Sequence, residues 1–156
     1  MRTLRYTGIA ALGALVIVGI GSAQEKRMKR SDLPPAVEST VDEVSRGATI
    51  KGFSQETENG ITSYEVKMLV SGDTKEVESN LSGAVKEIEE QVSMDSLSAH
   101  VAGGLNAKVA GGKIRKVESI TKNGKLVAYE AKIQDASGQK SEMQVGPNGK
   151  PLDDEE

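Results

Sequence analysis

Two stretches of the chain place apolar residues at helical spacing. In the first, four apolar residues recur three or four positions apart: Leu33, Val37, Val41 and Val44. Asp32 is a candidate N-cap, a pair of prolines occupies the first turn, and Gly47 is a typical helix end. The pattern predicts a short amphipathic helix between Asp32 and Gly47 with one apolar stripe.

The second helix is expected from about Asp95 to Ala110. It contains Gly103 and Gly104, each of which costs a helix interior about 1 kcal/mol relative to alanine. Because its intrinsic propensity is poor, we expect this helix to depend on packing against the rest of the protein.

Elsewhere apolar and polar residues alternate, which is typical of strands with one buried face. In residues 61–70, for example, Tyr64 lies on the apolar face and Glu65 on the polar face. Strands are expected near 50–53, 61–70, 75–79, 84–90, 114–120, 126–134 and 140–145. Residues 84–90 also fit a helix, but we assign a strand because the matching segment near the C-terminus ends in a turn at Pro147-Asn148-Gly149.

The chain matches itself at a shift of about 64 residues, which indicates a tandem duplication. The matching segments are Leu33–Val37 with Leu97–Val101, Gly47–Phe53 with Gly111–Val117, Asn59-Gly60 with Asn123-Gly124, and Tyr64–Lys67 with Tyr129–Lys132. The expected fold class is α+β: two tandem repeats, each one α-helix packed on a three- to four-stranded antiparallel β-meander. We assign repeat 1 to residues 32–92 and repeat 2, with an acidic tail, to residues 93–156.

These segments resemble the PepSY-like family, including its β-lactamase-inhibitor-like branch. The residues that carry the resemblance are Leu33–Val37, Gly47–Lys51, the Asn59-Gly60 hairpin, Tyr64–Val66 and Lys86–Glu90. The resemblance covers nearly all of residues 33–152; the second copy departs from it at Ser98, which replaces a proline. It implies an exported protein with a helix against an antiparallel sheet, and a role in binding or restraining peptidases or other envelope enzymes. It carries over no catalytic residue.

Residues 1–23 have the features of a cleaved export signal. Arg2 and Arg5 precede an uncharged run from Gly8 to Ile20, and small residues follow it up to Ala23. The run is shorter than the roughly 20 residues that span a bilayer. We therefore expect a periplasmic or secreted protein. Residues 24–31 are predicted to be a basic linker, through which any membrane contact would have to occur.

Composition and charge exclude several classes of function. The chain has no Cys, which excludes thiol chemistry and Cys-based metal sites, and it has one His. It has no Trp and only 3% aromatic residues, which disfavours aromatic stacking surfaces. From position 31 onward it holds 14 basic and 22 acidic residues, which repels nucleic acid. Residues 31–94 carry a net charge of −8, whereas residues 95–156 are neutral.

No candidate for catalysis has the partners that a mechanism needs. His100 has no nucleophile or carboxylate at recognisable spacing. Ser137 and Lys140 match the Ser-x-x-Lys string of penicillin-interacting enzymes, but they fall on a turn near the chain end instead of a helix start. The glycine pairs at 103–104 and 111–112 do not follow strands as phosphate-binding loops do. We expect no enzymatic activity, no catalytic or metal-ligating residue and no cofactor.

The leading hypothesis is an exported, non-enzymatic binding module that contacts or restrains another envelope protein such as a peptidase. Four residues are candidates for contacting the partner: Tyr64, Glu65, Tyr129 and Glu130. The alternative is a protein of the envelope that binds a small ligand or a cation through its acidic first repeat.

Overall fold

The computed structural model describes residues 26–109 and 111–152. The strands are β1 (Lys26–Met28), β2 (Thr49–Glu58), β3 (Ile61–Val70), β4 (Asp73–Asn80), β5 (Val85–Gln91), β6 (Lys113–Lys122), β7 (Lys125–Gln134) and β8 (Lys140–Val145). Two α-helices, α1 (Pro35–Val44) and α2 (Ala99–Lys108), and two single 3₁₀ turns, η1 (Arg30–Asp32) and η2 (Met94–Ser96), complete the described part. The export signal expected in residues 1–23 lies outside the described residues.

All eight strands belong to one antiparallel sheet in which each strand pairs with its neighbours in the chain, in the order β1 to β8. The expected α+β fold of two helix-on-meander repeats is therefore wrong, because β5 pairs with β6 and joins both halves into one mostly β structure. The internal sequence matches could not show this pairing, because it joins a strand of the first expected repeat to a strand of the second. The strand assigned to residues 84–90 is confirmed by β5.

The hairpins form where the Asn-Gly pairs predict them. Asn59 and Asn123 have φ values of 50° and 49°, and the glycines that follow them also have positive φ. Two consecutive residues in this conformation match the right-handed twist of the strands they connect. The two hairpins that these turns close, β2–β3 and β6–β7, form the longest ladders of the sheet, with nine residue pairs each.

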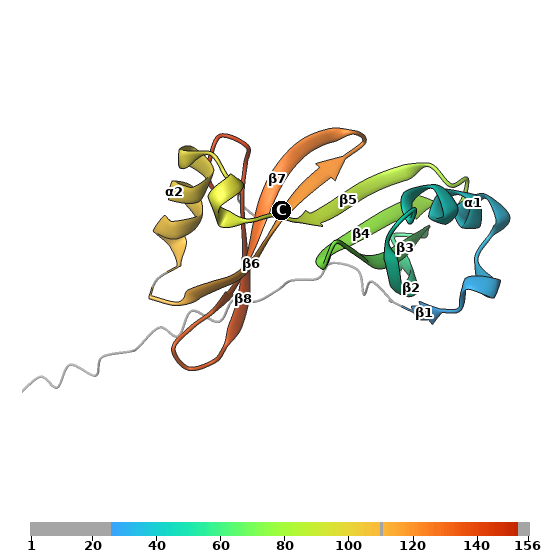
Figure 1. The fold of residues 1–156 in the computed structure, drawn as a ribbon, viewed down its shortest axis with the longest axis horizontal. Helices are drawn as coiled ribbons and strands as arrows, with labels where there is room; N and C mark the ends of the chain where they lie inside the picture. Colours follow the sequence, from blue (N-terminus) through green and yellow to red (C-terminus); the bar gives the residue numbers. More distant parts are fainter. Residues whose placement is uncertain (1–25, 110, 153–156) are drawn as a thin grey trace, which may run out of the picture.

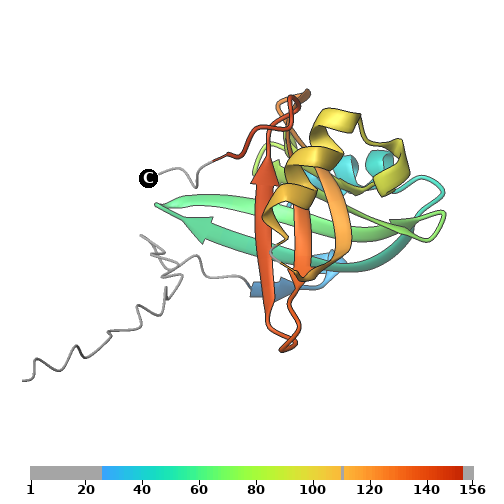
Figure 2. The same ribbon diagram turned by 90° about the vertical axis from the view of Figure 1, so that its left-hand side faces the viewer.

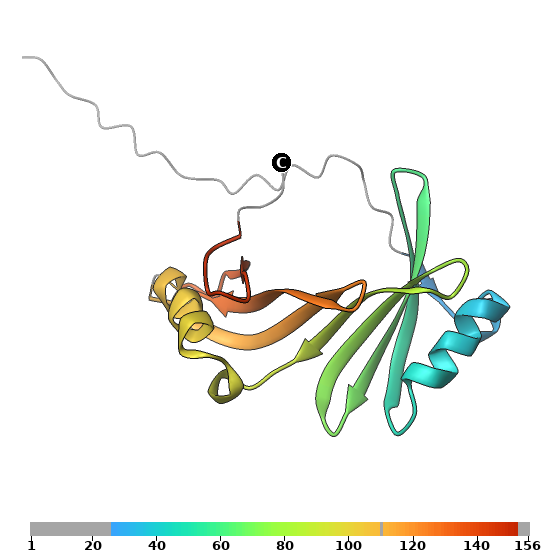
Figure 3. The same ribbon diagram turned by 90° about the horizontal axis from the view of Figure 1, so that it is seen from above.

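Both helices cover the same face of this strongly twisted sheet, near its two ends (Figures 1 and 3). Figure 2 shows that β7 and β8 run across the direction of β2 and β3. Under α1 the core contains Val37, Val41, Val66 and Met68, and under α2 a second core contains Val101, Leu105, Val117 and Val145. The other face carries no helix of the described part.

One of the two glycines of helix α2 allows a close approach of the chain that a larger residue would block. A Cβ on Gly104 would overlap the carbonyl oxygen of Gly149, in the turn after β8, whereas a Cβ on Gly103 would meet no atom within 4 Å. Helix α1 meets the turn between β4 and β5 in a similar way, since Thr40 donates a hydrogen bond of 2.7 Å to the carbonyl of Gly83. Helix α2 thus meets the turn after β8 at Gly104, and its expected dependence on tertiary packing stays a prediction.

Two segments near the N-terminus differ from expectation. Lys26–Met28, placed in the basic linker, is strand β1 at the edge of the sheet, and Met28 packs against the first core. Asp32 does not cap α1; it lies in η1, and the helix begins after Pro34. Arg30 forms ion pairs with Glu38 and Asp42 of α1 and so ties this segment to the helix.

Candidate functional site

The helix-free side of the sheet, called here the open face, is rich in carboxylates. Strand register places ten glutamates on it: Glu56, Glu58, Glu65, Glu76, Glu78, Glu87, Glu89, Glu118, Glu130 and Glu142. Four lysines form ion pairs with members of this set: Lys67, Lys116, Lys122 and Lys132. The open face is therefore negatively charged.

Several of these glutamates are direct cross-strand neighbours. The like-charged pairs are Glu65 with Glu78, Glu78 with Glu87, Glu76 with Glu89, and Glu118 with Glu130. Like charges directly opposite each other destabilise a sheet by some tenths of a kcal/mol per pair. The open face thus carries an arrangement that lowers the stability of the sheet.

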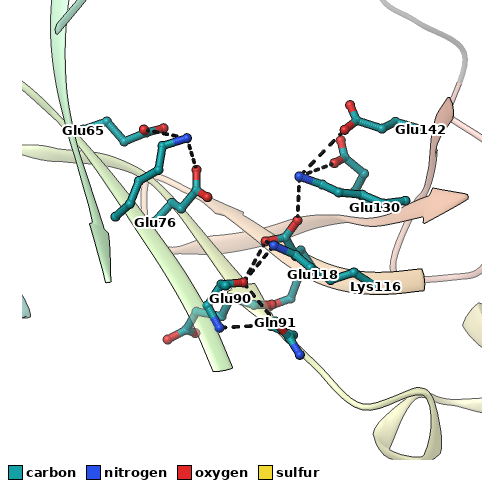
Figure 4. Close-up of polar contacts among 12 residues, drawn as sticks. Glu65, Glu76, Glu90, Gln91, Lys116, Glu118, Glu130 and Glu142 are labelled. Carbon is teal, nitrogen blue, oxygen red and sulfur yellow. Dashed lines mark hydrogen bonds and ion pairs between the residues drawn. The ribbon is translucent and has the colours of Figure 1, made fainter. Parts of the chain in front are cut away.

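Lysines offset part of this repulsion (Figure 4). The ammonium of Lys67 lies 3.2 Å from a carboxylate oxygen of Glu65 and 3.2 Å from one of Glu76. Burial still raises the pKa of Glu65, although Lys67 and the hydroxyl of Ser54 act to lower it. The carboxylate of Glu65 is thus partly buried, attracted by Lys67 and repelled by the neighbouring carboxylate of Glu76.

Glu118 is the one fully buried carboxylate of the open face. Its side chain is 1% exposed, with Lys116 Nζ at 2.6 Å from Oε1 and Lys132 Nζ at 3.1 Å from Oε2. The Oε2 atom accepts no hydrogen bond of good geometry, so the Lys132 ammonium satisfies it by charge. Burial acts to raise the pKa of Glu118, but the two lysines outweigh burial and lower it. Glu118 is therefore held as a carboxylate.

Thr74 joins this ion-pair group to the other half of the sheet. Its hydroxyl on β4 accepts a hydrogen bond of 2.8 Å from Lys116 on β6 and lies 3.4 Å from Oε1 of Glu118. The same hydroxyl donates to Gln91 on β5 at 3.3 Å. Thr74, Lys116 and Glu118, called here the polar bridge, thus connect β4 to β6 across β5.

Glu89 has a different environment on the same face. It is half-buried, forms no ion pair with the described lysines and arginines, and lies between carboxylates of both halves of the sheet. Burial first, and then the charges of Glu118, Glu130, Glu76 and Glu87, raise its pKa to about 7. With five other glutamates it lines a shallow hollow of about 180 Å³; those five are Glu56, Glu65, Glu76, Glu78 and Glu87.

The four residues proposed from the sequence fall on opposite faces. Glu65 and Glu130 lie on the open face, and Glu130 accepts a hydrogen bond of 3.0 Å from Gln144. Tyr64 is only 8% exposed in the first core, and Tyr129 packs against the second core. The structure thus brings the two glutamates to one surface and places the tyrosines on the opposite face, where Tyr64 is buried and Tyr129 is partly buried.

Sequence reasoning missed Glu89, Glu118 and the polar bridge. Alternation within residues 85–91 indicates that Glu87 and Glu89 share a face. Their approach to Glu118 depends on the pairing of β5 with β6, which no local pattern specifies.

The other motifs add no chemistry. His100 is exposed on α2, and the hydroxyl of Ser137 donates to Asp135 in the β7–β8 turn at 2.7 Å. Within residues 26–109 and 111–152, no helix has the length and apolar character needed to cross a bilayer.

No protein-family model and no curated protein matches the sequence. Solved structures do resemble the fold. A DUF2874 family protein from Bacteroides ovatus superposes with a TM-score of 0.60 at 21% identity, over 78% of this chain and 85% of that chain. A protein from Bacteroides eggerthii whose name places it in the periplasm gives 0.63 at 14% identity, over 78% and 86%. A BLIP-like protein from Bacteroides fragilis gives 0.55 at 17% identity, over 78% and 84%.

At these identities the likeness concerns the fold alone. It agrees with the resemblance to the β-lactamase-inhibitor-like branch at the level of fold, since one of the three structures is BLIP-like. None of the three has a name that refers to tandem PepSY-like units.

Proposed function

We propose that this protein is an exported, non-enzymatic binding module whose open face contacts another protein of the cell envelope, such as a peptidase. The location follows from the signal expected in residues 1–23 and agrees with the name of one structure of similar fold. The partner class follows from the resemblance to the PepSY-like family.

The observation that carries the proposal is the set of four directly opposed glutamate pairs on a face that no described helix covers. Such an arrangement costs stability, and surfaces that keep a costly arrangement are commonly those that function uses. A partner with positive charges on its contact surface would relieve the repulsion, and the same charges would speed its association.

Site-specific photo-crosslinking tests the proposal. A photoreactive amino acid replaces Glu65 or Glu130 on the open face, and Glu43, exposed on α1, serves as the matched control. After irradiation in envelope extract, we expect crosslinked protein from positions 65 and 130 and none from position 43. Equal yields at all three positions, or none at any, would contradict a binding role of the open face. A crosslinked partner that is no peptidase would correct the partner class alone.

A second candidate function is supported by the hollow lined by six glutamates, which would attract a cation or a small cationic ligand. Among the described residues, no three or more His, Cys, Asp or Glu side chains are grouped as a metal site, so a cation would have to draw side chains together. Calorimetry with Ca²⁺ and Mg²⁺ at physiological salt tests this function. Dissociation constants above about 1 mM would eliminate it, since even weak extracellular calcium modules bind more tightly than that.

A further inference from the structure

The two halves of the sheet have separate hydrophobic cores. The buried residues of the core under α1 are Leu33 and members of α1, β3 and β4, and those of the core under α2 belong to α2, β6, β7 and β8. Among the described residues, none belongs to both cores. The halves are therefore not fixed to each other by shared apolar packing.

The ladder that joins the halves is short and polar. It consists of five residue pairs between β5 and β6: Glu87 with Lys122, Ile88 with Thr121, Glu89 with Ile120, Glu90 with Ser119, and Gln91 with Glu118. None of these pairs joins two apolar residues. The β4–β5 ladder is also five pairs long, but it contains the apolar pair of Val77 and Ile88. The β5–β6 junction thus has less side-chain packing to resist bending than the ladders within each half.

Among the residues that the structure describes, only the polar bridge joins side chains of β4 to side chains of β6 across this junction. Lys116 reaches from β6 past β5 to the Thr74 hydroxyl on β4, at 2.8 Å. Lys116 is held in turn by Glu118 at 2.6 Å, and Glu118 is fully buried. The contact between Lys116 and Thr74 is partly buried and charge-assisted, and such a contact has a narrower geometry than a fully solvated one. This bridge therefore restricts how far β4 and β6 can rotate about β5.

We infer that the β5–β6 junction is a hinge between the two halves of the sheet, and that the polar bridge of Thr74, Lys116 and Glu118 sets its angle. Because both halves contribute glutamates to the open face, the hinge angle fixes how those glutamates are placed relative to one another. Opening or closing the hinge would adjust the open face to a binding surface without disturbing either core.

Pulsed electron paramagnetic resonance tests this inference, and the absence of native Cys makes labelling direct. Spin labels are attached at E43C on α1 and N106C on α2, which are both exposed. The doubly labelled parent should give a single narrow distance distribution. Thr74→Val and Lys116→Met should shift or broaden it, because each removes one side of the bridge.

Lys67→Met is the matched control. Lys67 also links two carboxylates of the open face, but both lie in the first half of the sheet. This variant should leave the distance distribution unchanged. Far-UV circular dichroism verifies the fold of each variant, and if Lys116→Met fails to fold, Thr74→Val decides the outcome. An unchanged distribution in Thr74→Val, or an equal change in Lys67→Met, would overturn the hinge, whatever the crosslinking of the open face shows.

Discussion

Gly104 of α2 lies against the carbonyl of Gly149 so closely that a methyl group at position 104 would overlap that backbone atom. The contact joins the helix to the turn after β8, and it explains why a poor helix former is kept in the middle of α2. At the preceding position of the same helix, a Cβ on Gly103 would meet no atom within 4 Å.

Gly104→Ala should therefore destabilise the protein by about 1 to 3 kcal/mol, because the turn must move to admit the methyl group. Gly103→Ala should stabilise it by about 0.5 to 1 kcal/mol, since alanine favours the helix and meets no atom. Thermal unfolding followed by circular dichroism measures both. Stabilisation by Gly104→Ala would show that the packing does not constrain the helix.

Removing the lysine that satisfies Glu118 Oε2 should cost more than removing a surface lysine. Lys132→Met leaves that oxygen buried without a cation and should lower the free energy of unfolding by about 1 to 3 kcal/mol. Lys122→Met removes an exposed ion pair with Glu87 at 3.4 Å and should cost less than about 0.5 kcal/mol. Urea unfolding of both variants at one pH measures the difference. Equal costs would mean that Lys116 alone satisfies Glu118.

Stability should fall with rising pH because of Glu89. Its pKa is about 7 in the folded protein against an ordinary value of 4.5, so the folded state binds this proton more tightly. That contribution is complete below about pH 4.5 and is lost as pH rises through 7. We expect the free energy of unfolding to fall by about 1 to 2 kcal/mol over this range. This is less than the full pKa shift would give, because the side chain is partly exposed to solvent.

Glu89→Gln should remove this loss, since the amide does not ionise. The difference in unfolding free energy between the variant and the parent, measured from pH 4 to 8, should grow across this window. Glu43→Gln on α1 changes the same charge away from the open face and serves as the control. A difference that stays constant with pH would contradict the raised pKa of Glu89.

Neighbouring residues of β3 should separate folding from binding. Tyr64→Ala empties part of the first core and should destabilise by about 3 to 5 kcal/mol. Glu65→Gln should change stability little, because its ion pair with Lys67 is partly exposed. It should nevertheless weaken capture of the envelope partner. Pull-down and unfolding measurements on the two variants check this, and unchanged capture by Glu65→Gln would argue against the open face as the contact surface.

Much of the local structure could be predicted from the sequence, because it depends on local signals. The Asn59-Gly60 and Asn123-Gly124 pairs mark hairpins, and alternation around Tyr64 places that side chain in the core. These features depend on backbone preference and on the period of the apolar residues, both of which can be read within ten residues.

The joining of the halves could not be predicted in this way. Pairing of Gln91 with Glu118 brings together residues that are far apart in the chain and polar on both sides. Neither residue belongs to a motif. Because glutamate is rarely buried, the sequence alone would place the side chain of Glu118 on the surface. The acidic character of the first half was visible from its net charge, but its concentration on one face follows only from the register of the strands.

The strand order of the sheet has a consequence for how the chain folds. Every strand pairs with the strand before it, so the sheet's contacts are close in sequence except in the β1–β2 and β5–β6 ladders, which each cross a helix. Proteins dominated by close contacts fold faster than other β proteins of similar size. A chain that leaves a membrane pore from its N-terminus could add each strand to an edge already formed. The β2–β3 hairpin, closed by the Asn59-Gly60 turn, would then be the first ladder on which the rest of the sheet assembles.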